Sequence, residues 1–211
     1  MPSKRRYVSP LREQSAARTH ALILDRATQL FAERGYGRVT VADIAAAAGV
    51  APKTVFASVG SKSDILNRIV DRGVSASGHE QAMKDLLALR TPESVLKALA
   101  HGTRVGNEEQ FAVHEAIRKA LPVHEDGEAL WERATAAYRE ALDTAARHLH
   151  TLTASPSHSV RETADLLWFW FGPSGWRTLV VESGWSWDRA EEVLHHTAAT
   201  TLASTWRSPA T

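Results

Sequence analysis

The stretch VADIAAAAGVAPKTVF, residues Val41–Phe56, decides how the N-terminal part of this chain folds. A short run of helix-forming residues is interrupted at Gly49 and starts again at Pro52. Glycine adopts the left-handed conformation of a tight turn at little cost, and proline is favoured in the first turn of a helix. Two short helices joined by a turn of three or four residues that begins with glycine are typical of a helix-turn-helix. The stretch therefore predicts this motif.

The second of these helices has one apolar side and one short, weakly charged side. Val55 and Val59 are four residues apart and are expected to face the core. The residues left facing outward are Lys53, Thr54, Ala57 and Ser58, with Phe56 at the edge. Small side chains allow a helix to approach the major groove of DNA closely, and lysine and threonine can reach base edges. This face predicts DNA recognition, although similar corners also occur in helical proteins that bind no DNA.

The composition excludes several classes of function. The chain has 211 residues, 44% of them hydrophobic, which suffices for one large domain or two small ones. It contains no cysteine, so disulfides, thiolate metal sites and cysteine nucleophiles are excluded. No apolar run approaches the roughly 20 residues that cross a bilayer, and the first residues lack the apolar stretch of a signal peptide. We therefore expect a cytoplasmic protein with no membrane partner.

Positive charge is concentrated near the N-terminus. Residues 1–70 contain 11 Lys or Arg and 5 Asp or Glu, a net charge of +6, and residues 71–211 carry a net charge of −5. A positive region is where a polyanion such as DNA would bind. A solvated surface is the other interpretation of the same charge.

Apolar residues recur at helical spacing along nearly the whole chain, and strand patterns are absent. The expected fold class is therefore all-α. The expected helices span residues 15–35, 40–48, 52–59, 61–89, 92–104, 108–121, 126–152, 160–182 and 187–206. Pro173 is expected to kink the helix over 160–182, because proline removes a backbone donor and collides with the preceding turn.

The segment Ile23–Leu66, ILDRATQLFAERGYGRVTVADIAAAAGVAPKTVFASVGSKSDIL, resembles the DNA-binding domain of the tetracycline-repressor (TetR) family of transcriptional regulators. The resemblance has no gap and includes LFAERGY, TVADIAAAAGV, TVF, and SK followed by IL. It implies that Thr40 and Lys62 contact the DNA backbone and that residues of the second helix face the groove. With Ser58 on the same outward face, the candidate DNA-binding residues are Thr40, Ala51, Lys53, Thr54, Phe56, Ser58 and Lys62.

Two features of the sequence modify this implication. Phe56, Ser58 and Val59 stand where the family commonly has tyrosine, an aromatic or histidine, and phenylalanine. Phe56 lacks a hydroxyl that could bond a phosphate, and Ser58 is too short to replace an aromatic side chain. Lys62, in contrast, opens the next helix, where a cation and unpaired backbone N–H groups could bind a phosphate.

The resemblance also implies a homodimer, in which the last two helices of each chain form a four-helix bundle, and a pocket for a small-molecule effector among the other helices. The run LLWFWF, Leu166–Phe171, is apolar on all sides, which fits burial on two faces. The candidate ligand-binding residues are aromatic side chains on apolar helix faces and three polar ones: His101, Arg104, His114, Trp131, Tyr138, Trp168 and Phe171. Packing in the core is the alternative for each aromatic residue.

These observations predict three parts: a basic arm (residues 1–14) that enters a minor groove or is disordered, a helix-turn-helix DNA-binding domain (15–62), and a helical effector-binding and dimerisation domain (63–211). The implied function is a ligand-responsive repressor that a small molecule releases from a palindromic operator in double-stranded DNA. An activator on the same fold is one alternative, and the ten histidines suggest a metal-dependent helical enzyme as another. Their spacings do not match a zinc-binding helix, so we expect no catalytic residue, cofactor or metal ion.

Overall fold

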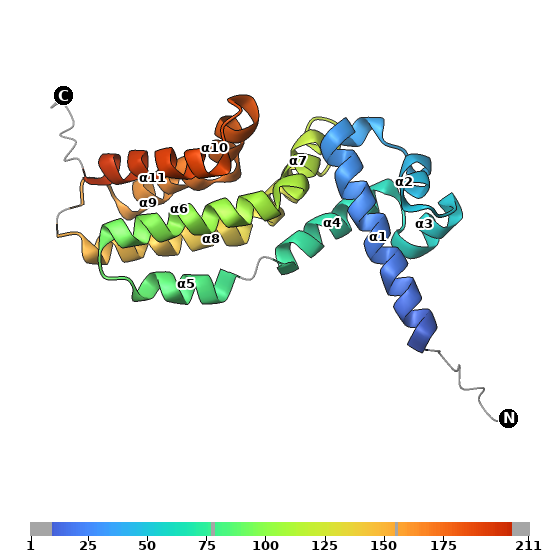
Figure 1. Cartoon of the computed structure of the whole chain (residues 1–211), viewed down its shortest axis with the longest axis horizontal. Helices are drawn as coiled ribbons and strands as arrows, with labels where there is room; N and C mark the ends of the chain where they lie inside the picture. Colours follow the sequence, from blue (N-terminus) through green and yellow to red (C-terminus); the bar gives the residue numbers. More distant parts are fainter. Residues whose placement is uncertain (1–9, 77–78, 155, 204–211) are drawn as a thin grey trace. The chain divides into compact units, whose positions relative to one another are not determined.

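The computed structural model describes residues 10–76, 79–154 and 156–203, and every regular element in these ranges is helical (Figure 1). This confirms the all-α class. In chain order the elements are α1 (Pro10–Arg34), η1 (Tyr36–Arg38), α2 (Val41–Ala48), α3 (Pro52–Val59), α4 (Lys62–Ala76), α5 (His79–Ala88), α6 (Pro92–Glu109), α7 (Phe111–Ala120), α8 (Gly127–Leu152), α9 (Val160–Phe171), α10 (Pro173–Arg177), η2 (Thr178–Glu182) and α11 (Trp187–Ala203).

The first helix begins earlier than expected. α1 starts at Pro10, so residues 10–14 of the expected arm belong to this helix, whose start was expected at residue 15. Proline suits this position because the first N–H groups of a helix have no intrahelical partner. The rest of the arm, residues 1–9, lies outside the described residues, as does the expected extension of the last helix to Trp206.

Two expected helices are interrupted. The helix expected over 61–89 is divided into α4, which ends at Ala76, and α5, which begins at His79. The helix expected over 160–182 is broken at Pro173 rather than kinked, because Gly172 has an extended backbone (φ −69°, ψ 165°). A residue that precedes proline is disfavoured in the helical region. The short α10 and a π-helical turn, η2, follow the break.

The chain forms two compact units. Unit 1 contains residues 1–73 and 112–132, and unit 2 contains residues 74–111 and 133–211. By packing, the N-terminal unit therefore continues beyond residue 62 and includes α7 and the start of α8. Two of the helices, α4 and α8, begin in unit 1 and continue in unit 2.

Each unit has its own apolar core. In unit 1, α1 packs against α2 and α3, which also pack against each other. Its fully buried side chains include Ile23, Phe31, Ile44, Val55, Val59, Ile65, Leu66, Ile69 and Ile117. In unit 2, α6 lies beside α11, as Figure 1 shows, and α5, α8, α9 and α10 add to the same core. Its buried residues include Leu96, Leu142, Leu149, Leu167, Trp170, Phe171, Trp176 and Leu194.

Gly172→Ala tests the tight break after α9. The substitution is expected to destabilise the protein by about 1–3 kcal/mol, because the added Cβ would lie 2.4 Å from the main-chain oxygen of Trp168. Gly102→Ala on α6 is the matched control, since a Cβ there meets nothing within 4 Å. Removing this helical glycine should stabilise the protein by about 0.5–1 kcal/mol. Urea unfolding measures both, and equal stability of the two variants would contradict the described packing.

Candidate nucleic-acid interface

Helices α2 and α3 form the corner that the sequence predicts. At the start of α2, the Thr40 hydroxyl accepts the N–H of Asp43 at 3.2 Å, and the Asp43 carboxylate accepts the N–H of Thr40 at 2.8 Å. Gly49 ends α2 in the left-handed conformation (φ 66°), and Pro52 is the first residue of α3. The bend between the two helices is 99°, within the range of about 90–120° for the motif.

The face of α3 is divided as expected. Val55 and Val59 are fully buried, and Lys53 and Ala57 are exposed on the other side. Phe56 is 56% exposed, which leaves a large aromatic side chain in contact with solvent. The outward surface therefore carries one cation and one aromatic ring among small side chains. Of the other α3 candidates, Ala51 is exposed at the N-cap, whereas Thr54 and Ser58 are half-buried.

Lys62 has an internal use that the sequence does not reveal. Its ammonium donates to the main-chain oxygens of Tyr36 at 3.1 Å and Val39 at 3.0 Å, and it lies 4.2 Å from the centre of the Tyr36 ring. An ammonium has three N–H donors, so two of them hold the η1 segment against α4. A phosphate contact by Lys62 stays a prediction that depends on the third.

The backbone N–H groups at the start of α4 are also partly used. The N–H of Ser61 donates to the Asp64 carboxylate at 2.8 Å, and the N–H of Asp64 donates to the Ser61 hydroxyl at 3.2 Å. Hydrogen bonds from the Ser61 hydroxyl and backbone lower the pKa of Asp64, and bonds from Thr40 lower the pKa of Asp43. The first turns of α2 and α4 therefore each contain a carboxylate that is charged near neutral pH. Fewer backbone N–H groups are therefore free to bind a phosphate at the start of α4 than the sequence predicts.

His20 on α1 contacts the end of α3. Its Nδ1 lies 3.1 Å from the main-chain oxygen of Ser58 and 3.5 Å from the Ser58 hydroxyl. Because a carbonyl only accepts, Nδ1 carries the proton in this contact. An imidazole from α1 thus lies next to position 58, where the family commonly has an aromatic side chain or histidine. No local pattern in the sequence could have predicted this contact between residues 38 positions apart.

His124, in the segment between α7 and α8, connects that segment to α4. Its Nδ1 accepts the N–H of Asp126 at 3.1 Å, so its Nε2 carries the proton and donates to the Ser63 hydroxyl at 2.9 Å. The ring also packs edge-on against Tyr36, with 5.2 Å between ring centres. Burial, and to a lesser degree the charge of Glu125, raise the pKa of Tyr36. These contacts lie within unit 1 and attach the α7–α8 segment to both η1 and α4.

Three of the predicted ligand-binding residues lie together in unit 2. The rings of Tyr138 and Trp168 pack edge-on at 5.8 Å, and the Tyr138 hydroxyl donates to the main-chain oxygen of Phe171. The same hydroxyl accepts from the Asn107 amide at 3.0 Å. Burial raises the pKa of Tyr138, so its hydroxyl stays protonated. Arg139 covers the Trp168 ring at 3.8 Å. The polar and aromatic groups of this cluster therefore already have partners within the chain.

The remaining four candidates lie elsewhere. His101 and Arg104 on α6 face α11, where His101 lies 3.4 Å from Glu191 and Arg104 lies 2.7 Å from Asp188. His114 and Trp131 belong to unit 1, where their rings pack edge-on at 6.0 Å. The structure thus brings three of the seven candidates together, and the ligand role of all seven stays a prediction. A cavity in unit 2 is lined by none of the seven.

In the part of the chain that the structure describes, no group of three or more His, Asp or Glu side chains could hold a metal ion. No single helix in residues 10–76, 79–154 and 156–203 is long and apolar enough to cross a membrane, although the bent pair α2 and α3 together passes the same length and composition test.

Residues 23–69 match the family described as bacterial regulatory proteins, tetR family. The match covers α2, α3 and the adjoining parts of α1 and α4. It includes the helix-turn-helix corner of α2 and α3 and confirms that this corner belongs to a TetR-type DNA-binding domain. A comparison with curated proteins gave no significant match.

Several solved structures share the fold over most of the chain. A TetR family transcriptional regulator, PfmR from Thermus thermophilus, is 20% identical, with a TM-score of 0.63 over 95% of this chain and 100% of that one. A transcriptional regulator from Saccharomonospora viridis in complex with choline is 20% identical, with a TM-score of 0.69 over 87% and 96%. The regulator FadR from Bacillus subtilis in complex with stearoyl-CoA is 18% identical, with a TM-score of 0.66 over 89% and 100%. At these identities the likeness shows the fold.

Burial of His114 predicts a loss of stability in mild acid. Burial lowers the pKa of His114 from 6.5 to about 4, and the charge of Glu115 opposes this only in part. Between these values the unfolded chain binds a proton that the folded chain does not, so stability falls as the pH falls from 6.5 towards 4. The loss is about 1.4 kcal/mol per pH unit, or roughly 3 kcal/mol over the window.

His114→Leu should remove this part of the pH dependence. Urea unfolding at pH 7, 6 and 5 measures it, with His196→Leu, at an exposed position of α11, as the control that keeps the wild-type dependence. Identical pH dependence in the two variants would exclude a neutral, half-buried His114 in the folded chain.

Proposed function

We propose that this chain, a DNA-binding transcriptional regulator of the tetR family, is a cytoplasmic repressor that a small molecule releases from a palindromic operator. Regulators of this family are not enzymes, so the metal-dependent enzyme is set aside. The observation that carries the proposal is the outward face of α3. The opposite, apolar face of this helix is buried in the core, and the helix lies within residues 1–70, where positive charge is concentrated.

That face fits the major groove for three reasons. Val55 and Val59 fix the helix in the core of unit 1, so that its opposite side faces outward in one orientation. The side chains there are short enough for close approach, and Lys53 and Thr54 carry groups that reach base edges. The exposed Phe56 ring can pack against thymine methyl groups, the apolar feature of the major groove.

A small-molecule effector is supported by the relatives of known structure. Two regulators with this fold were solved with choline and with stearoyl-CoA. These two ligands differ in charge and length, so the fold accepts ligands of different chemistry and the identity of an effector here does not follow from them. For this chain the proposed effector domain is the part beyond residue 62.

The proposed response passes from unit 2 to unit 1 through α8. This helix runs without a break from Gly127 in unit 1 to Leu152 in unit 2, so an effector that displaces it in unit 2 also acts on its first turn. The segment before that turn holds His124, which bonds Ser63 at the start of α4. A change of about 2.7 kcal/mol in this coupling would lower operator affinity 100-fold.

A homodimer is supported by apolar side chains that the chain itself leaves exposed. In the run Leu166–Phe171, Leu167, Trp170 and Phe171 are buried within one chain, but Phe169 is 70% exposed. Val181, in the turn after α10, is also exposed. A second copy that covers these residues would bury apolar area from water. Trp170, only 5% exposed, belongs to the core of its own chain and does not test this interface.

Substitutions on α3 and α4 should affect DNA binding in different ways. Thr54→Ala is expected to change which operator variants are preferred, by about 1–3 kcal/mol per affected base pair. Lys62→Ala should weaken binding to all sequences alike, because it loosens η1 and removes a cation that is expected to contact the DNA backbone rather than the bases.

Fluorescence anisotropy with a set of operator variants at two salt concentrations measures both effects. Lys97→Ala, an exposed position on α6, is the control and should bind as the wild type does. An unchanged order of preference in Thr54→Ala would exclude base reading by that residue.

A charge at Phe169 tests the dimer. Phe169→Glu is expected to give folded monomers, because the interface would have to bury an unpaired carboxylate. Leu87→Glu on α5 places the same charge at another exposed apolar residue and should leave the dimer intact. Sedimentation velocity distinguishes the two, and a Phe169→Glu protein that remains dimeric would place the interface elsewhere.

A further inference from the structure

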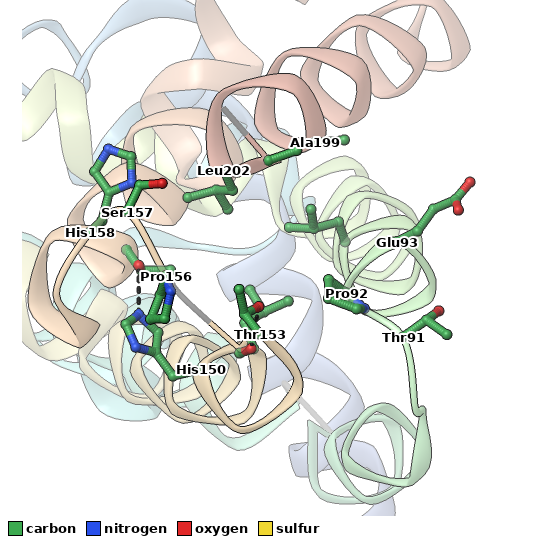
Figure 2. A pocket seen from close by; sticks show the side chains of 14 residues that line it. Thr91, Pro92, Glu93, His150, Thr153, Pro156, Ser157, His158, Ala199 and Leu202 are labelled. Atoms are coloured by element: carbon green, nitrogen blue, oxygen red, sulfur yellow. Dashed lines mark hydrogen bonds between the residues drawn. The ribbon is translucent and has the colours of Figure 1, made fainter. Parts of the chain in front are cut away.

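Unit 2 contains a cavity of about 500 Å³ that is separate from the aromatic cluster around Tyr138. We name it the terminal cavity. It is enclosed by the start of α6, the end of α8, the segment that leads into α9, and the end of α11, which meet in Figure 2. In α8, Tyr138 precedes the cavity residue His150 by 12 residues, which is about 18 Å along the helix axis. A ligand in the terminal cavity would therefore not occupy the aromatic cluster.

The lining of the terminal cavity is mainly apolar. Leu96 and Leu149 form part of its wall and are otherwise buried in the core of unit 2, and Ala199 and Leu202 line it from α11. Protein interiors are close-packed, and voids larger than a water molecule are few. A space of this volume lies within the range of about 300–1,000 Å³ that is typical of small-molecule sites. An apolar occupant would remove leucine side chains from water.

The polar groups of the cavity favour an oxygen acceptor over a cation. His150 and His158 both line it, and Nε2 of His150 lies 3.0 Å from the hydroxyl of Thr163. An imidazole offers an N–H donor when neutral and two when protonated. Glu93 also belongs to the lining, but in Figure 2 its carboxylate points away, on the side opposite the two imidazoles.

One more carboxylate lies near these imidazoles and has other partners. The charge of His158 contributes to lowering the pKa of Glu162, so the two groups are close. The Glu162 carboxylate accepts the N–H of Ser159 at 2.7 Å and the Ser159 hydroxyl at 2.8 Å, and these bonds are the main cause of its lowered pKa. It serves as the cap of α9 and is not among the residues that line the cavity.

We propose that the terminal cavity binds a small molecule with an apolar body and a carboxylate or carbonyl oxygen at one end. The apolar body lies against Leu96, Leu149 and Leu202, and the oxygen accepts a hydrogen bond from the imidazole of His150. The role of this molecule as an effector rests on the proposed function, whereas its binding does not.

Three probes that share a ten-carbon chain and differ in the head group test the proposal on the full chain without DNA. Isothermal titration calorimetry at pH 7 compares decanoate, 1-decanol and decyltrimethylammonium below their micelle concentrations. Decanoate is expected to bind saturably, once per chain, and the cationic probe at least tenfold more weakly. Absence of saturable decanoate binding, or equal affinity for all three probes, would overturn the proposal.

Two variants place the binding in the cavity. Ala199→Trp fills it and should weaken decanoate at least tenfold, whereas Thr200→Trp adds the same side chain at the next, exposed position of α11 and should not. His150→Leu should weaken decanoate about tenfold, the loss expected for a hydrogen bond to a charged group, and leave the cationic probe unchanged.

Thermal melting followed by circular dichroism establishes that each variant is folded. If Ala199→Trp does not fold, His150→Leu with His196→Leu as its control gives the same discrimination. Equal decanoate affinity in a variant and its control would exclude the terminal cavity as the site. These titrations contain no operator DNA. If the chain proved not to regulate an operator, the binding results would therefore still hold.

Discussion

The burial of Val55 and Val59 is the constraint on which the proposed DNA-binding face depends. The two side chains point to the same side of α3 because they are four residues apart, and both are fully buried where α3 packs on α1 and α2. A shift of one residue along the helix would rotate this face by about 100°. Gly49 and Pro52 fix where α2 ends and α3 begins, so the turn and the core determine together which side chains face outward.

A second set of contacts holds this corner to the rest of unit 1. Lys62 binds the main-chain oxygens of Tyr36 in η1 and of Val39, and the Tyr36 ring contacts both the Lys62 ammonium and the His124 ring. His124 in turn donates to Ser63 at the start of α4. A lysine and a histidine that resemble DNA-contacting or metal-binding residues in the sequence thus stabilise the protein from within. The same contacts give the α7–α8 segment a route to the start of α4.

In unit 2 the aromatic cluster around Tyr138 and the terminal cavity are separate features. Its aromatic cluster is internally satisfied, since the Tyr138 hydroxyl both donates and accepts and Arg139 covers Trp168. Its cavity lies further along α8 and is lined by leucines, alanines and two histidines that no pattern singles out. Abundant tryptophan therefore indicates a large core here, as for Trp170 and Trp176, and is a poor guide to the position of a cavity.

The sequence by itself determined the all-α class, the helix-turn-helix and the buried side of α3, because each depends on neighbours within about two helical turns. It also contained the cause of the break at Pro173, although the break was expected as a kink. Only the tertiary structure decided what Lys62, His20 and His124 contact, since their partners lie 23, 26, 38 and 61 residues away in the chain. The terminal cavity likewise forms where three regions that are distant in the sequence meet, and periodicity within one helix carries no information about such a meeting.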